Sequence, residues 1–267
     1  MPLDTPAKAF ADSPLEIVTV ACLADNYDFL IHDPVSGATA VVDVADPAPI
    51  EAELARRGWQ LSEIWLTHHH WDHIDGAVPL RAATGAKITG AAADAHRLPA
   101  LDRVVQPGEA FEFGGSLVDI IDVPGHTIGH IAFHIPSAHA LFSADSLMAL
   151  GCGRLFEGTP EQMFETMQRL AQLPDETVLY SGHEYTASNA KFALTIEPAN
   201  QALISRSEAI LNARAEDQPT VPSLLRDEKA TNPYLRAHLD SVKTSLDMAD
   251  ASDLDVFTEI RRRKDNF

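Results

Sequence analysis

The first two thirds of the chain consist of short runs of apolar and β-branched residues separated by turn residues. Runs of this length, with Gly, Pro, Asn or Asp between them, are typical of β-strands. We therefore predict strands that assemble into sheets at Leu15–Leu23, Tyr27–Asp33, Ala38–Val44, Leu61–Thr67, Ala86–Ala91, Ser116–Val123, Gly129–Ile135, Ala138–Ala144 and Thr177–Gly182.

Helical spacing of apolar residues appears between these strands at Pro49–Arg57, Gly76–Ala83 and Pro160–Gln172. The third helix is the clearest, because Thr159 can cap it and Pro160 suits its first position. Strands mixed with helices that can cover the sheet faces indicate a layered α/β or α+β core.

The pattern changes after Gly182, since no later run resembles a strand. Helical spacing predominates, with a loop at Gln218–Pro222. Without an internal repeat or a long linker, the last eighty or so residues are expected to pack on the core as a helical appendage. Its predicted helices are Glu184–Leu194, Pro198–Arg214, His238–Met248 and Asp253–Lys264.

Composition narrows the possible functions. The 267 residues include 20 Lys+Arg and 39 Asp+Glu, a formal charge of −19, which disfavours binding to a nucleic-acid backbone. No run of apolar residues is long enough for a membrane span, and the opening segment lacks a basic leader before an apolar stretch. The two cysteines, Cys22 and Cys152, are too few for a disulfide framework. We expect a cytoplasmic protein with neither nucleic-acid nor membrane partners.

The densest group of chemically active residues is Thr67–His73, with the sequence Thr-His-His-His-Trp-Asp-His directly after an apolar run. Imidazole and carboxylate are the ligands that suit zinc, iron and manganese. In an extended segment His68 and His70 point the same way and can share one ion. If the chain then turns, Asp72 and His73 can face a second ion. The segment therefore predicts a metal site.

Three other strand ends carry possible ligands. His126 lies in a Pro-Gly turn between two strands, Asp145 follows an apolar run, and His183 stands where a strand gives way to a helix. Each of these residues alone is weak evidence, because a single His after a strand is more often structural. Their joint occurrence with the Thr67–His73 segment is what indicates a catalytic metal centre.

Together these residues resemble the metallo-β-lactamase superfamily, whose pattern is His-x-His-x-Asp-His followed by a His, an Asp and a final His. The resemblance implies a four-layer αβ/βα sandwich over residues 1–187 and a C-terminal helical domain over residues 188–267. It also implies two divalent ions, most simply Zn²⁺, with Fe or Mn as alternatives. One ion would be held by His68, His70 and His126 and the other by Asp72, His73 and His183, with Asp145 bridging them.

The flanking motifs resemble the hydroxyacylglutathione hydrolase family, also called glyoxalase II. These motifs are residues 151–159, 182–186, 232–236 and 261–267, so the resemblance covers nearly the whole chain. It implies hydrolysis of S-D-lactoylglutathione to D-lactate and glutathione. We separately expect the chain to be a monomer. The glutathione-binding positions of the family correspond to Arg154, Tyr185, Arg261 and Lys264.

Three positions depart from the family pattern. Arg154 replaces a common Lys, and Phe156 replaces a Tyr found in some members. Asp75 replaces a common Gly beside the Thr67–His73 segment, called the metal loop below. His69 is expected to point away from the metals, and His130 to support a ligand rather than to be one. Cys152 is interpreted as structural.

The mechanistic hypothesis is that two ions acidify a shared water, whose hydroxide attacks the thioester carbon while Asp72 orients it. The main alternative is a persulfide dioxygenase of the same superfamily with a single iron, which shares the metal loop. An RNA-processing nuclease is disfavoured by the acidic charge. A metal-binding module without catalysis is disfavoured because no ligand is missing from the pattern.

Overall fold

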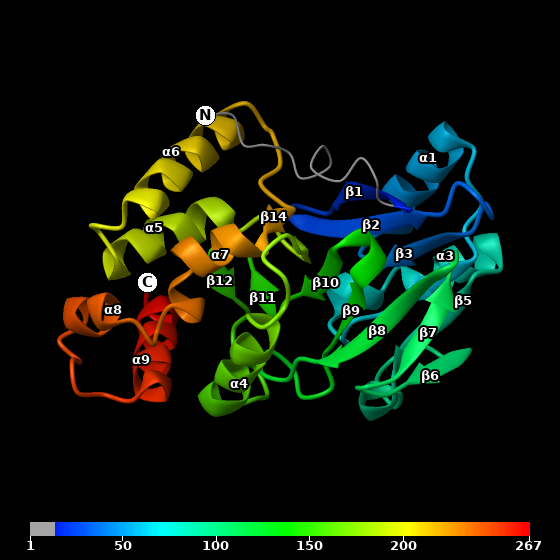
Figure 1. Cartoon of the computed structure of the whole chain (residues 1–267). Coiled ribbons are helices and arrows are strands. Elements are labelled where there is room, and N and C mark those ends of the chain that lie inside the picture. Colours follow the sequence, from blue (N-terminus) through cyan, green and yellow to red (C-terminus); the bar gives the residue numbers. More distant parts are fainter. Residues whose placement is uncertain (1–13) are drawn as a thin grey trace. The chain divides into compact units, whose positions relative to one another are not determined.

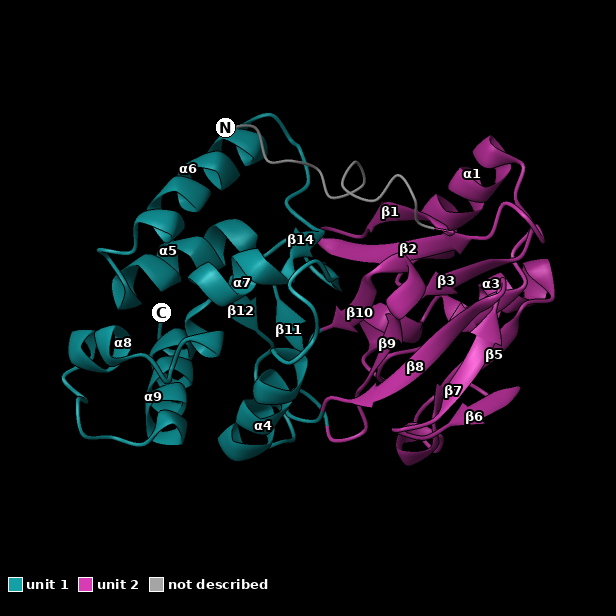
Figure 2. Cartoon of the chain, in the orientation of Figure 1, with its two compact units in different colours: residues 1–6, 124–127, 145–267 teal, residues 7–123, 128–144 magenta. Residues whose placement is uncertain are grey.

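A computed structural model describes residues 14–267 (Figure 1). The opening segment, on which the expected absence of an export leader depends, lies outside the described residues. The described chain divides into two compact units (Figure 2). Unit 2 contains residues 14–123 and 128–144, and unit 1 contains residues 124–127 and 145–267. The expected domain boundary after residue 187 stays a prediction.

Unit 2 begins with a mixed six-stranded sheet whose strand order follows the sequence. The first three strands are antiparallel, and the last four, counted from the third, run parallel to one another. Helices α1 (Pro47–Arg57) and α3 (Ala77–Thr84) make two of the parallel crossovers. The strands are β1 (Glu16–Cys22), β2 (Asn26–His32), β3 (Thr39–Val42), β4 (Glu63–Trp65), β5 (Lys87–Ala91) and β6 (Arg103–Val105).

A second set of strands in unit 2 is antiparallel, with neighbours in the order β10, β9, β8, β7. Short 3₁₀ turns at η2 (Ala92–Asp94) and η3 (Pro136–Ala138) connect parts of this unit. The strands of the second set are β7 (Ala110–Phe113), β8 (Ser116–Asp122), β9 (Ile131–Ile135) and β10 (Ala140–Ala144).

The two-residue alternation of β4 explains how the layers of unit 2 pack. Ile64 belongs to a buried cluster with Ile50 and Leu80 from the covering helices. Trp65 points to the other face and is fully buried. Its ring lies 5.2 Å from that of Phe111 and 5.4 Å from that of Phe133, which belong to the second set of strands. The first sheet therefore has helices on one face and strands on the other.

Unit 1 holds the helical region together with one small hairpin and one pair of short antiparallel strands that are distant in the sequence. Helix α4 begins with the N-cap expected from the sequence, Thr159, and adds a capping box: the Thr159 hydroxyl accepts from the N–H of Gln162, and the Gln162 side chain accepts from the N–H of Thr159. The elements of this unit are β11 (Leu147–Met148), β12 (Gly151–Cys152), α4 (Pro160–Leu170), β13 (Val178–Ser181), α5 (Thr186–Ile196), α6 (Gln201–Ala215), β14 (Ser223–Leu224), α7 (Leu225–Thr231), η4 (Pro233–Leu235), α8 (Asp240–Ser245) and α9 (Asp253–Asp265).

The expectation that no strand follows Gly182 is wrong, since β14 pairs with β13. Two residues are too short to produce an alternating pattern, and Ser223 contributes no apolar signal. Helix α7 was also not predicted, because its buried Glu228 interrupts the helical spacing of apolar residues. Among the described residues, no helix is both long and apolar enough to cross a bilayer.

Candidate metal centre

The histidine-rich segment of unit 2 joins β4 to the four-residue helix α2 (Trp71–Ile74). His68 is fully buried, and its Nδ1 lies 3.0 Å from the Thr67 hydroxyl. Its Nε2 lies 3.2 Å from Nδ1 of His70, and the two rings are 4.8 Å apart. The extended backbone thus places both imidazoles on the same side, as their spacing predicts.

Asp43 supports the metal loop from the end of β3. Its carboxylate accepts hydrogen bonds from the N–H of Thr67 at 2.9 Å and from the Thr67 hydroxyl at 2.8 Å. It also accepts from Nδ1–H of His73 at 2.9 Å. This bond places the proton of His73 on Nδ1 and leaves Nε2 as the basic nitrogen. Sequence reasoning missed Asp43 because it lies inside a predicted strand and outside the motif.

His69 points toward Asp94 and belongs to none of the groups that could hold a metal. Its Nδ1 lies 3.0 Å from Oδ2 of Asp94, a fully buried carboxylate that also accepts from Arg97 at 2.5 Å. Gly129 packs directly on this carboxylate, since a Cβ there would lie 2.1 Å from Oδ1 of Asp94. His69 therefore anchors the outer side of the loop.

His130 is buried and stacks on His68, with the ring centroids 4.6 Å apart and the planes 8° from parallel. Its Nδ1–H donates to the carbonyl of Ile131 at 3.0 Å. The ring supports the face of His68 and, like His69, lies outside the groups that could hold a metal. This position agrees with the supporting role expected from the sequence.

In unit 1, three of the expected ligands are buried, namely His126, Asp145 and His183. Oδ2 of Asp145 lies 3.4 Å from Nε2 of His126 and 3.3 Å from Nε2 of His183. Nδ1–H of His126 donates to the carbonyl of Arg154 at 2.8 Å, so Nε2 is again the basic nitrogen. Gly153 is required here, because a Cβ would lie 1.9 Å from the carbonyl oxygen of Asp145.

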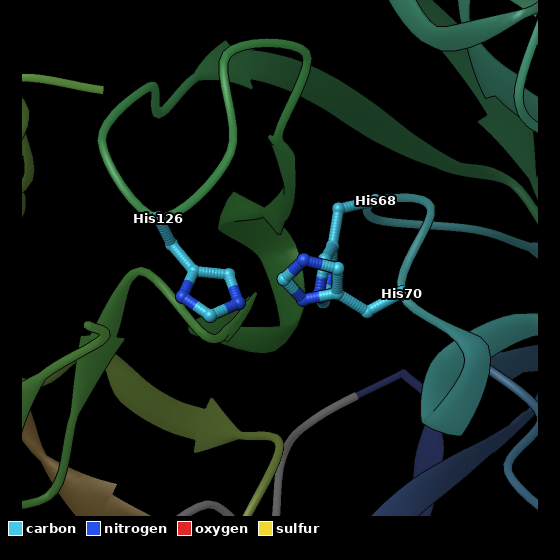
Figure 3. A group of neighbouring side chains, drawn as sticks. All are labelled: His68, His70 and His126. Atoms are coloured by element: carbon cyan, nitrogen blue, oxygen red, sulfur yellow. The ribbon is translucent and has the colours of Figure 1, made fainter. Parts of the chain in front are cut away.

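Three groups in the described chain offer ligand atoms that all lie within 4.8 Å of one another. Figure 3 shows the first group, in which the rings of His68, His70 and His126 are turned toward each other. Imidazole nitrogen and carboxylate oxygen suit zinc, iron and manganese, so these groups can hold divalent metal ions. The groups are His68 with His70 and His126, Asp72 with His73 and His183, and Asp43 with His68 and His73.

The third group differs from the other two. Asp43 is bonded to the Nδ1 side of His73, behind the nitrogen that remains basic, and to Thr67. A carboxylate engaged in this way orients the imidazole rather than competing for the same ion. The first two groups coincide with the two ligand sets expected from the sequence. Asp145 belongs to neither group, but it lies beside His126 of the first and His183 of the second.

The four expected substrate-binding residues all lie in unit 1 and differ in exposure. The side chain of Arg154 is 59% exposed, and Tyr185 stacks on His183 with 4.7 Å between the rings. Nζ of Lys264 lies 5.3 Å from the ring centre of Phe192, and burial lowers the pKa of Lys264. Arg154 and Tyr185 thus contact His126 and His183, whereas Lys264 lies against Phe192 and Phe267.

Arg261 is buried, so its guanidinium has little surface left for a ligand. Nη1 donates to the carbonyl of Cys152 at 3.1 Å, and Nη2 donates to Oδ1 of Asp265 at 2.7 Å. The same oxygen lies 3.7 Å from Nε of Arg154. Burial raises the pKa of the Cys152 thiol to about 11, which agrees with the structural role expected for it.

The other two departures from the family pattern lie at the surface. Phe156 is exposed, and its ring meets that of His126 edge-on at 5.3 Å. Asp75 is exposed and ends α2, with its N–H donating to the carbonyl of Trp71 at 2.9 Å.

The turn between β11 and β12 is held by Glu228, a fully buried carboxylate that sequence reasoning missed. It accepts from the N–H of Leu150 at 2.7 Å and from the Ser223 hydroxyl at 2.7 Å, and it pairs with Arg206. The side-chain amide of Asn232 also donates hydrogen bonds to the carbonyls of Met148 and Gly151. The hairpin that precedes Arg154 is thereby fixed to the helical region.

Comparison with known proteins gives two family matches. Residues 28–183 match the model of the metallo-β-lactamase superfamily, and residues 184–267 match that of the hydroxyacylglutathione hydrolase C-terminus. The chain is similar to the hydroxyacylglutathione hydrolase of Ruegeria pomeroyi, with 59% identity over 95% of this chain and 100% of that protein. A second relative of the same name, from Jannaschia sp., is 60% identical over 94% of this chain and 98% of its own.

Solved structures share the fold. The BLEG-1 B3 metallo-β-lactamase matches with a TM-score of 0.65 and 16% identity, covering 82% of this chain and 99% of its own. The crystal structure of TTHA1623 in a di-iron-bound form matches with a TM-score of 0.55 and 26% identity, covering 63% of this chain and 91% of its own. The chain therefore has the metallo-β-lactamase fold, with mixed sheets and helices, and a C-terminal helical region.

Proposed function

The chain belongs to the hydroxyacylglutathione hydrolase family of the metallo-β-lactamase superfamily, and we propose that it hydrolyses S-D-lactoylglutathione to D-lactate and glutathione using two divalent ions. The family membership makes it a metallohydrolase of glutathione thioesters. The observation that carries the finer assignment is the pair of three-ligand groups, each with its atoms within 4.8 Å. Both groups offer the donors that a divalent ion needs.

We propose that His68, His70 and His126 hold one ion and that Asp72, His73 and His183 hold the other, with Asp145 bridging them. Nε2 of His126 and Nε2 of His183 both lie beside one carboxylate oxygen of Asp145, at 3.4 and 3.3 Å, which supports a bridging role for this carboxylate. Zinc is our first choice because three imidazole or carboxylate ligands are typical of catalytic zinc sites. The di-iron-bound relative supports a two-metal site and keeps iron as the next candidate.

Two divalent ions in these positions would supply an acidified water and polarise the thioester carbonyl. We propose that Asp72 orients the attacking water as well as binding an ion, since it belongs to one of the ligand groups. The leaving group is a thiolate, which needs little help from an acid. Cys152 takes no part as a nucleophile, because it is buried and its pKa is raised.

The substrate is a thiol peptide with carboxylates, which cationic side chains hold through charge-assisted hydrogen bonds. We propose that Arg154 and Lys264 contact these carboxylates and that Tyr185 packs beside them, since each is at least partly accessible. Arg261 is buried and bonded to Asp265 and to the Cys152 carbonyl, so we propose that it supports Arg154 through Asp265, whose Oδ1 lies 3.7 Å from Nε of Arg154. A monomeric state and a cytoplasmic location stay predictions.

A persulfide dioxygenase with a single iron is the alternative from the same superfamily, and the comparisons do not favour it. The curated relatives at 59% and 60% identity over almost the whole chain are named hydroxyacylglutathione hydrolase.

The test combines metal analysis with a lactoylglutathione assay on the same preparation. Asp145→Ala or His183→Ala is expected to lose thioesterase activity together with bound metal, whereas His238→Ala, at an exposed histidine outside the site, should lose neither. Full activity in metal-free Asp145→Ala protein would contradict the scheme. A single iron with oxygen consumption and sulfite formation would establish the dioxygenase instead.

A further inference from the structure

Asn26 makes two contacts with Asp72 that no motif of the metal site includes. Its side-chain amide donates to the backbone carbonyl of Asp72 at 3.0 Å and to Oδ2 of the Asp72 carboxylate at 3.2 Å. Both partners are acceptors, so the NH₂ group must face them. One side chain thereby fixes both the backbone and the carboxylate of the same residue.

We propose that Asn26 is a positioning residue that holds Asp72 ready for the second ion. This inference rests on the proposed two-metal function. Asn26 lies outside the metal loop by more than forty residues, and it reaches Asp72 because both belong to unit 2.

Asp72 needs such support because its local structure supplies little. It lies in α2, a helix of four residues whose N-cap, His70, makes no side-chain capping bond. Helices this short are not stable by themselves. The Asp72 side chain is 19% exposed, so water can compete for its carboxylate, and a fixed donor restricts its rotamers. Holding it in one rotamer removes an entropy cost that metal binding would otherwise carry.

The anchor itself is rigid. Asn26 is 5% exposed and opens β2, where its backbone pairs with Cys22 of β1. Strand β2 is buried along most of its length, so the amide cannot move away from α2 without disturbing the sheet. The position of the donor is therefore set by the core, as preorganisation of a metal ligand requires.

The chemistry of this position also favours an amide. A Lys or Arg would partly neutralise the carboxylate and weaken its attraction for a cation. An amide is neutral, so it orients Asp72 and leaves its full charge available. The same arrangement recurs at the other ligands, where neutral or carboxylate partners hold His68 and His73 from behind.

The test measures zinc binding to metal-depleted protein by competition with a chromophoric chelator. The wild type is expected to bind two ions. Asn26→Ala and the similarly sized Asn26→Leu should bind one ion as the wild type does and the other about 10- to 100-fold more weakly. Asp72→Ala identifies which binding step belongs to Asp72. The melting temperature of each metal-free variant reports whether the fold is intact.

The matched control is Asn189→Ala. Asn189 is buried to the same degree, at 6% exposure, and its amide donates to a backbone carbonyl, that of Ala149, at 3.0 Å. It should lower the melting temperature without a selective loss of one ion. A wild type that binds fewer than two ions would contradict the proposed function. Asn26 variants that bind both ions normally, or weaken both equally, would overturn the role of Asn26 while leaving that function intact.

Discussion

Replacement of Asp43 by Asn should disable one metal position without unfolding the protein. Asp43 has a backbone φ of +56°, a left-handed conformation that Asn tolerates better than most residues. The substitution keeps the shape of the side chain but exchanges one acceptor oxygen for an NH₂ donor. The three hydrogen bonds that the carboxylate accepts, at 2.8 to 2.9 Å, can no longer all be made.

The amide has two orientations, and each loses a contact. With its oxygen toward the N–H of Thr67, its NH₂ faces Nδ1 of His73 and can donate only if the His73 proton moves to Nε2. That is the nitrogen assigned to the metal. With the amide reversed, NH₂ meets the Thr67 N–H and leaves a buried donor unsatisfied, at a cost of about 1–3 kcal/mol.

We therefore expect zinc affinity at the group of Asp72, His73 and His183 to fall about 10- to 100-fold, because partners of ligating histidines contribute that much. A chelator competition measures the affinity, and long-range ¹H–¹⁵N correlation spectra report the His73 tautomer in metal-free protein. Asp94→Asn is the matched control, since it alters an equally buried Asp–His pair, but one that holds His69 instead of a ligand. An Asp43→Asn protein that binds both ions with wild-type affinity would refute the reasoning.

Three further outcomes follow from buried contacts. Gly129→Ala should destabilise the fold by about 1–3 kcal/mol in denaturant titrations, because its Cβ would lie 2.1 Å from Asp94, and an unchanged midpoint would contradict this. Glu228→Gln should cost about 3–5 kcal/mol by the same measurement, since Arg206, whose side chain is only 11% exposed, loses its charged partner; a loss under 1 kcal/mol would count against it. Cys22 and Cys152 should react with thiol reagents at pH 8 only after unfolding. Burial raises the pKa of both thiols, that of Cys152 to about 11, and the reactive thiolate forms only as the pH approaches the pKa. Rapid labelling of the native protein would exclude this explanation.

Local patterns were sufficient for the main elements of the fold. Alternating apolar runs predicted most strands because each buried strand must place an apolar side chain on a packed face every second residue. Helix α4 could be predicted because its N-cap, Thr159, and its first residue, Pro160, are adjacent in the sequence. The two-residue strand β14 could not be predicted, because it pairs with β13, which is far away in the sequence.

The candidate ligands were recognisable from the sequence because they are reactive residue types concentrated after strands, with five of them within residues 68–73. Their supporting residues were not. No motif includes the supporting residues Asn26, Asp43 and Asp94. Each forms a hydrogen bond with a residue of the Thr67–His73 segment at least 25 positions away in the sequence. Only folding of the sheet and its loops shows that these polar side chains are directed at the metal loop.

The sequence by itself determined which atoms could bind a cation, since imidazole and carboxylate chemistry is a property of the residue. Tertiary structure alone decided which nitrogen of each imidazole stays basic and which cation is accessible. Asp43 sets the tautomer of His73, and burial directs the Arg261 guanidinium to Asp265, while its role toward the substrate stays a prediction. The physical reason is that protonation, orientation and exposure depend on neighbours, and folding brings those neighbours together from distant parts of the chain.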